Sequence, residues 1–165
     1  MADARPVIVG IAPAEGYSRP FDPATRSGTM LLELAGAPSY RELQKSFRMT
    51  NLSHYPLILP RASRSKKRLS AYRAELGELA RAFRIDPNAS YILAGFEVRR
   101  AFGSRILPEE GRANLEPFTW WRSRIGPMVA ILPHPSGMNR FYNSIDNRRL
   151  ASQFLRECAF RKVEY

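Results

Sequence analysis

Three short apolar runs alternate with longer stretches of helical spacing along the chain. The runs lie at residues 6–11, 90–95 and 128–132, and each is continuous rather than alternating. A continuous run of this length is typical of a strand that is buried on both faces of a parallel sheet. Residues 49–52 fit the end of a further strand. We therefore expect a mostly parallel sheet whose strands are separated by helices.

Five segments have the apolar spacing or the terminal residues that are typical of helices. The clearest spans residues 65–83, where apolar side chains recur every three or four positions. The others are expected at residues 29–36, with Gly36 as the C-cap, and at residues 40–47, 96–102 and 147–160. Strands that alternate with helices in this way predict an α/β layered fold.

The loops that follow two of the predicted strands are rich in proline and glycine. GIAPAEG follows the first run and opens an irregular loop over residues 12–27, and PHPSGMNR follows the last run. Loops of such length are more often functional than idle. In open parallel sheets, ligands bind outside the carboxyl ends of the strands. If the two strands are neighbours, their loops border one crevice.

Composition and charge limit the class of protein and of partner. The 165 residues are 44% hydrophobic and 25% charged, which fits a single globular domain over residues 1–165. The 26 Lys and Arg against 15 Asp and Glu give a net charge of +11, which favours a polyanionic partner. No apolar run is long enough for a membrane span, and the N-terminus lacks a secretory pattern. We expect a cytoplasmic protein with no membrane contact.

The sequence gives no reason to expect a cofactor. The single cysteine, Cys158, excludes an internal disulfide. No Cys/His cluster has the spacing of a zinc or iron–sulfur site. We therefore expect neither a metal nor a prosthetic group.

The basic residues are densest between residues 61 and 73. This cluster includes Arg64, Lys66 and Lys67. A cluster of this kind is usually a solvated surface. With the high net charge, a stripe of phosphate contacts is the favoured interpretation.

His134 is the strongest candidate for chemistry. It follows a predicted strand directly and stands between Pro133 and Pro135, which restrict the backbone on both sides. The alternative is a histidine that merely ends a strand. His54 lies in a polar loop without such support, and we interpret it as a surface residue.

Five segments, in order along residues 7 to 155, match the motifs of one family. They are GIAPA at residues 10–14, Pro20-Phe21 with Gly28 and Leu31-Leu32, Thr50-Asn51-Leu52, YILAGFEVRRAF at residues 91–102, and HPSGMN at residues 134–139. Together they resemble the uracil-DNA glycosylase superfamily. The resemblance implies a three-layer α/β/α sandwich with a mostly parallel central sheet. Some relatives hold an iron–sulfur cluster with four cysteines, which this chain lacks.

The resemblance implies which residues bind the base. Ile11, Ala12 and Pro13 would form a turn whose backbone faces a base flipped out of DNA. Phe21 would stack on that base, or else it is a core aromatic beside a helix. Asn51 would pair with the edge of a pyrimidine, because its carboxamide both donates and accepts. Its alternative is an Asx turn after a strand.

The resemblance implies a catalytic role for His134 but leaves open which residue activates or positions the water. His134 would donate a hydrogen bond to the base oxygen as negative charge develops there. Relatives often place Asp, Asn or Glu in the first motif to activate or position water, whereas Ile11 and Ala12 stand there in this chain. One branch of the family also has Ala. Glu15 and Asp22, in the same loop, are the candidates for the missing carboxylate, and each is otherwise a surface residue.

The segment after His134 is expected to contact DNA. Ser136 and Gly137 suit phosphate, because small residues let backbone N–H groups approach the strand. Met138 stands where many relatives carry an apolar wedge that fills the gap left by a flipped nucleotide. Asn139 and Arg140 would reach phosphates or the orphaned base, although Arg140 fits a solvated surface equally well.

Two aromatic pairs are left open by the sequence. Phe141-Tyr142 is either a stacking platform or the packing beneath its loop. Trp120-Trp121 lies between polar and charged residues and is either exposed near DNA or part of the core.

Three functions are therefore considered. The leading one is a monofunctional, monomeric DNA glycosylase that flips a uracil-like or modified pyrimidine out of DNA and hydrolyses its N-glycosidic bond. The diverged first motif favours a modified base and a prokaryotic or phage setting. The second is a non-catalytic DNA-binding module that keeps the base pocket. The third, an enzyme of free nucleotides, is disfavoured because a free nucleotide does not need so many cations.

Overall fold

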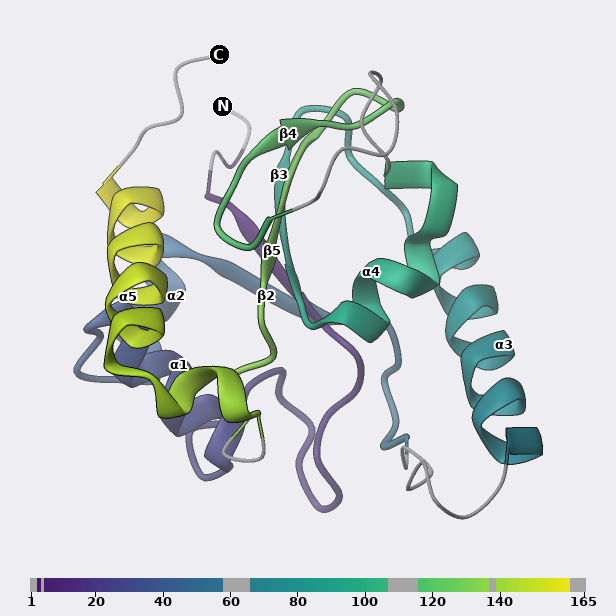
Figure 1. Ribbon diagram of the computed structural model, residues 1–165, viewed down its shortest axis with the longest axis horizontal. Helices are drawn as coiled ribbons and strands as arrows, with labels where there is room; N and C mark the ends of the chain where they lie inside the picture. The colour runs from purple at the N-terminus through teal and green to yellow at the C-terminus, as the bar shows by residue number, and fades with distance from the viewer. Residues whose placement is uncertain (1–2, 4, 58–65, 107–115, 137–138, 161–165) are drawn as a thin grey trace.

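A single five-stranded sheet runs through the middle of the computed structural model, which describes residues 3, 5–57, 66–106, 116–136 and 139–160 (Figure 1). Its strands, in spatial order, are β2 (Arg48–Asn51), β1 (Val7–Gly10), β3 (Ser90–Ala94), β5 (Met128–Leu132) and β4 (Trp121–Arg122). The first four are parallel, and β4 joins β5 antiparallel. The expected mostly parallel α/β sheet is confirmed.

The four parallel strands end at the same edge of the sheet. Gly10 is the register partner of Asn51, and Ala94 is the partner of Leu132. The strands that carry the two Pro- and Gly-rich loops are not neighbours, because β3 lies between them. Their loops nevertheless emerge at one edge, at the lower end of the sheet in Figure 1.

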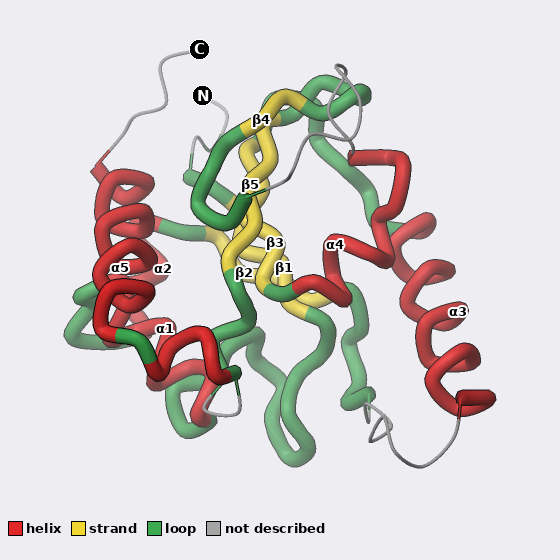
Figure 2. Tube along the Cα trace, viewed as in Figure 1, coloured by secondary structure: helices red, strands yellow, loops and turns green. Residues whose placement is uncertain are grey.

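Helices cover both faces of the sheet, as Figure 2 shows. On one side lie α1 (Arg26–Ala35), α2 (Tyr40–Ser46) and α5 (Ile145–Phe160), and on the other lie α3 (Lys66–Ala82) and α4 (Phe96–Phe102). Alternate strand residues face opposite ways, so Ile92 belongs to the apolar layer under α1 and α5, and Leu93 to the layer under α4. Burial on both faces explains why the strands are continuous apolar runs.

The observed helices agree with the expected ones to within a few residues. The largest difference is at α1, which begins at Arg26 because Thr25 caps it, its hydroxyl accepting from the Gly28 N–H at 3.1 Å. Gly36 ends α1 in the left-handed region at φ 64°, as expected for a C-cap.

Three short elements were not expected. β4 consists of two residues, too few for a periodic signal. The 3₁₀ turn Gly103–Ile106 follows α4, where the polar sequence of residues 104–117 predicts a loop, and a second turn, Arg140–Asn143, precedes α5. Residues 107–115 of that stretch lie outside the described residues.

The long loop after β1 is pressed tightly against the first turn of α1. A Cβ atom on Gly28 would lie 2.0 Å from the Asp22 carbonyl oxygen and 2.5 Å from that of Phe21. On α3, a Cβ on Gly77 would meet only the Arg81 guanidinium, at 3.7 Å. The first glycine is therefore required by packing and the second is not.

We expect Gly28→Ala to lower the free energy of unfolding by about 1–3 kcal/mol, because backbone must move to make room. Gly77→Ala, the matched control, should raise it by about 0.5–1 kcal/mol, since alanine loses less backbone entropy in a helix. Urea denaturation of both variants measures this. An unchanged midpoint for Gly28→Ala would contradict the tight contact.

Candidate functional site

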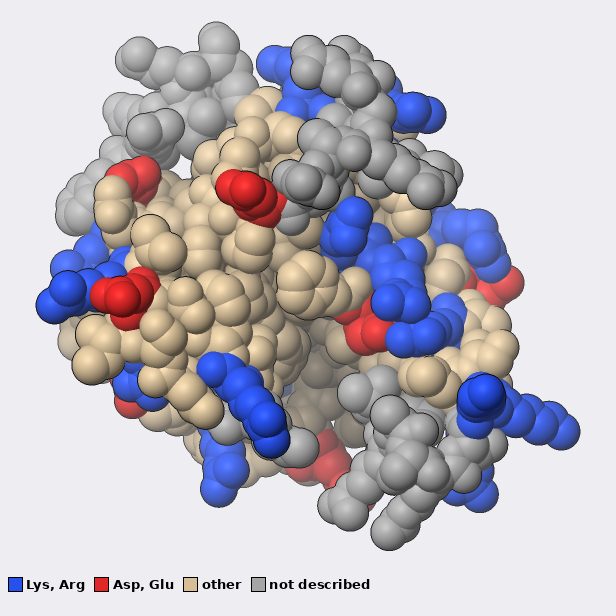
Figure 3. All heavy atoms as spheres, viewed as in Figure 1, with Lys and Arg blue, Asp and Glu red and all other residues tan. Residues whose placement is uncertain are grey.

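A cavity of about 510 Å³ lies at the carboxyl edge of the sheet, where the surface is hollowed in Figure 3. Residues from the ends of all four parallel strands line it. It brings together most of the residues expected to bind or cleave a nucleotide: Ile11, Ala12, Pro13, Phe21, Asp22, Asn51, His134, Ser136 and Asn139. These positions span 129 residues of sequence (139 − 11 + 1), so the parallel sheet is what collects them.

Asn51 faces the cavity from the last position of β2. Its side chain is 8% exposed, and its carboxamide makes no hydrogen bond to any described residue. An Asx turn would require such a bond, so that interpretation does not apply. A Cβ on Gly10, its register partner, would lie 2.4 Å from the Asn51 Oδ1. The amide atoms remain accessible from the cavity, so water or a ligand there can form hydrogen bonds with them.

Phe21 forms part of the cavity wall and part of the core at once. It is 8% exposed, packs in the apolar layer under α1 and α5, and comes within 3.0 Å of the Cβ that Gly10 would have. Its backbone has φ 51°, a left-handed conformation that is uncommon for a bulky residue. Strained backbone of this kind concentrates at functional sites. The interpretation of Phe21 as a core aromatic is therefore confirmed, and its stacking on a base stays a prediction.

His134 leaves β5 directly and is held by its surroundings. Gly95, at φ 108°, approaches it so closely that a Cβ there would lie 3.2 Å from the His134 Cβ. The carbonyl of His134 accepts hydrogen bonds from Asn139 Nδ2 at 3.0 Å and from the Ser136 N–H at 2.8 Å. The carbonyl of Pro133 accepts from the buried Tyr142 hydroxyl at 2.6 Å.

The imidazole of His134 has an unusual proton affinity. Burial lowers its pKa below the ordinary 6.5 of a histidine, because the charged form loses its hydration. Its ring makes no hydrogen bond to a described residue. A neutral imidazole keeps one N–H donor, and here that donor is free for a ligand in the cavity.

Of the two carboxylates expected to handle water, only one reaches the cavity. Asp22 lines it, and its Oδ1 accepts from the Ala24 N–H at 3.0 Å. Glu15 is exposed in the same loop and is not part of the lining.

The far wall of the cavity comes from residues that received no site role in the sequence analysis. Glu97 on α4 forms a two-pronged ion pair with Arg73 on α3, with distances of 3.0 and 3.2 Å. Tyr72 lies beside them, and burial, with Glu97 and Glu75 adding to it, raises its pKa to about 12. Phe96 forms part of the rim. The sequence did contain an indication for Phe96 and Glu97, because they lie just after the carboxyl end of β3, where ligands bind in parallel sheets.

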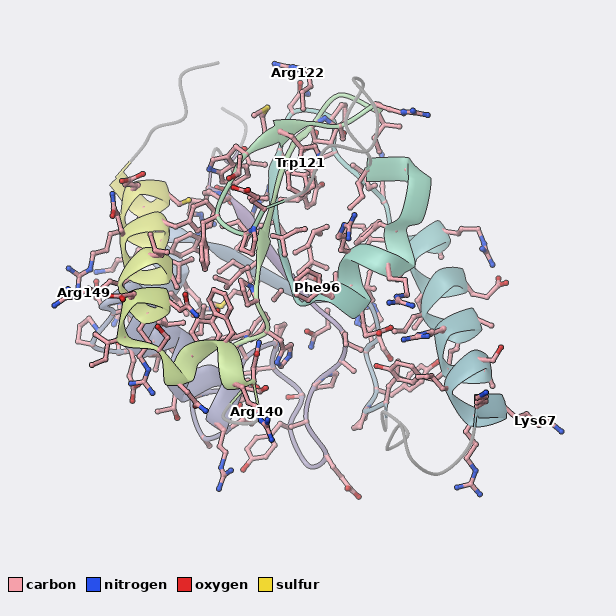
Figure 4. The ribbon with its side chains drawn as sticks, viewed as in Figure 1. Lys67, Phe96, Trp121, Arg122, Arg140 and Arg149 are labelled. Carbon is pink, nitrogen blue, oxygen red and sulfur yellow. The ribbon has the colours of Figure 1, made fainter. Side chains whose placement is uncertain are left out.

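The other residues expected to contact DNA are distributed differently. Ser136 lines the cavity. The carboxamide of Asn139 is used in a hydrogen bond within the loop, where its Oδ1 accepts from the Phe141 N–H at 3.1 Å. Arg140 is exposed, and so are Lys66 and Lys67 at the start of α3; Figure 4 places Arg140 and Lys67 on opposite sides of the loops that leave the sheet. Gly137, Met138 and Arg64 lie outside the described residues.

Both aromatic pairs serve packing. Tyr142 is buried, and Phe141 lies 5.8 Å from Phe118, so this pair lies under its loop. Trp120 packs on Phe154, and Trp121 donates its indole N–H to the Ile106 carbonyl at 2.8 Å. Trp121 pairs with Val129 near the start of β5, away from the cavity (Figure 4).

In comparisons with known proteins, the profile of no protein family matches the chain, and no curated sequence is significantly similar to it. Within the described ranges, no group of three His, Cys, Asp or Glu side chains is placed to hold a metal ion. No helix in those same ranges has the length and apolar character to cross a bilayer.

We expect His134 to titrate below pH 6.5 in the folded protein. The unfolded chain then binds the proton more tightly, so the folded state loses stability as pH falls below about 6.5 and regains it as pH rises through that window. NMR titration of the imidazole C–H signals, assigned with His54→Gln, measures this pKa. His134→Gln should remove the corresponding change in unfolding free energy, and a titration at or above pH 6.5 would contradict the burial.

Proposed function

We propose that the protein is a monofunctional DNA glycosylase, which takes a uracil-like or modified pyrimidine out of DNA and hydrolyses its N-glycosidic bond. The observation that carries this proposal is the meeting of Phe21, Asn51 and His134 around one cavity. One residue offers an aromatic surface, the second an unsatisfied amide, and the third a neutral N–H donor. Those are the groups that a flipped base needs.

The chemistry follows from where charge develops. As the N-glycosidic bond breaks, the electron pair stays with the base and positive charge builds on the sugar, and a water oxygen then bonds to the anomeric carbon. The N–H of His134 stabilises the growing negative charge on a base oxygen. Asp22 is the carboxylate placed to hold the water and accept its proton.

The cavity is large enough to admit a modified pyrimidine as well as a plain one. A pyrimidine ring fills on the order of 100 Å³ at the packing density of organic solids. The cavity of about 510 Å³ holds such a ring, its deoxyribose and a further substituent. The Asn51 carboxamide then reads the edge of the ring, since it offers both a donor and an acceptor.

A non-catalytic DNA-binding module is the second candidate. The observation that favours it is that the apolar residues Ile11 and Ala12 line the cavity. At these positions, members of the family that the sequence resembles often carry a polar side chain. In this case the same residues would hold an extruded base without cleaving it, and Asp22 would serve only the turn that it forms with Ala24.

We expect His134→Ala to lower the rate of base release by about 10²–10³-fold, because one donor to a developing anion is lost. Binding to the same DNA should change little. The measurement is alkali cleavage at abasic sites in single- and double-stranded oligonucleotides that carry uracil, hypoxanthine, 5-hydroxymethyl or glucosylated pyrimidines. Binding without release of any of these bases would support the second candidate instead.

We expect Asp22→Asn to lower the same rate by about 10²–10⁴-fold, since an amide cannot accept the proton of water. The substitution keeps the oxygen that accepts from the Ala24 N–H, so the loop should be unaffected. Glu15→Gln is the matched control and should retain the wild-type rate. Equal rates for wild type and Asp22→Asn would remove Asp22 from the mechanism.

A further inference from the structure

Phe96 is an exposed aromatic side chain on the rim of the cavity. It is the first residue of α4, it is 53% exposed, and it lines the cavity. Figure 4 labels it near the start of α4. The packing of α4 uses Val98 and Phe102, which are buried, so Phe96 is not needed to hold the helix in place. Scattered exposed apolar residues are ordinary, and only the surroundings of Phe96 give it meaning.

Those surroundings are cationic. Arg99 and Arg100 lie three and four positions after Phe96, so all three side chains share one face of α4. Arg99 forms no ion pair with a described residue, and Arg100 is exposed with its Nε 3.9 Å from Glu97. Figure 3 shows Lys and Arg side chains gathered over α4 beside the hollow. An aromatic surface flanked by arginines matches the bases and phosphates of a nucleic-acid strand.

Phe96 and Phe21 occupy different sides of the cavity. Phe21 belongs to the apolar layer beneath α1 and α5, whereas Phe96 stands on α4, which covers the opposite face of the sheet. Phe21 lies against Asn51 over Gly10, so it is the surface for an extruded base. Phe96 is therefore available to contact a different base of the same DNA strand.

We propose that Phe96 is a stacking surface for the base next to the extruded one, and that Arg99 and Arg100 hold the phosphates of that nucleotide. Taking one base out of a stack exposes the face of its neighbour, and an aromatic ring can cover that face. The ligand class is single-stranded or locally opened DNA. This inference rests on the proposed function, because it takes the cavity as the place of the extruded base.

A double-mutant cycle between the protein and the DNA tests the contact. The probe is a short single-stranded oligonucleotide with one 2′-fluorinated deoxyuridine, whose glycosidic bond resists cleavage, between two thymidines. In two further probes, an abasic analogue replaces the thymidine on one side or the other. Fluorescence anisotropy gives the Kd of each probe for wild type and Phe96→Ala.

For wild type, we expect one of the two abasic probes to bind about 5- to 100-fold more weakly than the parent, the range found for stacking on an aromatic side chain. Phe96→Ala should bind the parent more weakly by a similar factor and should not distinguish the probes. Phe96→Trp should restore the difference and Phe96→Leu should not. Leu150→Ala, which removes a side chain of nearly equal exposure (52%) from α5, should behave like wild type.

Arg100→Gln tests the phosphate part. It should reduce the slope of log K against log salt by about 0.7, the value for one phosphate contact on a single strand. An unchanged slope would remove Arg100 from the contact.

The outcomes separate this inference from the proposed function. If the abasic probes differ in the same way for Phe96→Ala as for wild type, the stacking contact is wrong, whether or not any base is excised. If Phe96 shows the coupling and no base is released from any DNA, the contact stands and glycosylase activity fails. If wild type binds none of these probes, this inference is overturned, whereas the proposed function is overturned only if no base is released in the alkali-cleavage assay.

Discussion

The candidate site depends on how closely two side chains approach the backbone of Gly10. Asn51 Oδ1 and the Phe21 ring occupy the space that a Cβ would take, at 2.4 and 3.0 Å. The Asn51 carboxamide and the Phe21 ring therefore lie close to each other over the Gly10 backbone. Asn51 is the register partner of Gly10, so strand pairing fixes one side of this arrangement. The left-handed backbone of Phe21 and the close contact of its loop with Gly28 fix the position of the aromatic ring.

The same principle operates at the neighbouring strand, β3. Gly95 follows β3, and its missing side chain lets His134 lie against the backbone at the end of the next strand, β5. Hydrogen bonds from Asn139 and Tyr142 then hold the carbonyls of residues 133 and 134. Neither bond uses the imidazole itself. The backbone of residues 133 and 134 is thus held by hydrogen bonds while the His134 ring makes none to a described residue, which is the condition for a preorganised binding group.

Much of the fold followed from local patterns, because strands buried on both faces must be apolar throughout and the amphipathic helices repeat every three to four residues. The meeting of the loops after β1 and β5 was expected from the rule that ligands bind at the carboxyl ends of parallel strands, although these strands are not neighbours. The family resemblance, and not this rule, assigned Asn51 to the site. The α4 side of the site did not. Tyr72 has helical spacing and is buried, so nothing in its pattern separates it from a core residue. The pairing of Trp121 with Val129 depends on tertiary contact alone.

The charges of the described site are arranged in two zones. The inner zone contains the uncharged Asn51, His134 with its lowered pKa, the carboxylates of Asp22 and Glu97, and the guanidinium of Arg19. Exposed cations such as Arg140, Lys67 and Arg100 lie outside it. If DNA is the ligand, as proposed, its phosphates are attracted to the cations of the outer zone, whereas an uncharged base can enter the cavity without leaving a charge unpaired. A protonated His134 would weaken this discrimination, because a cation inside the cavity would also attract phosphate. If the cavity takes a base, as proposed, the burial that lowers the pKa of His134 favours that base over a phosphate at neutral pH, because a neutral imidazole adds no positive charge to the lining.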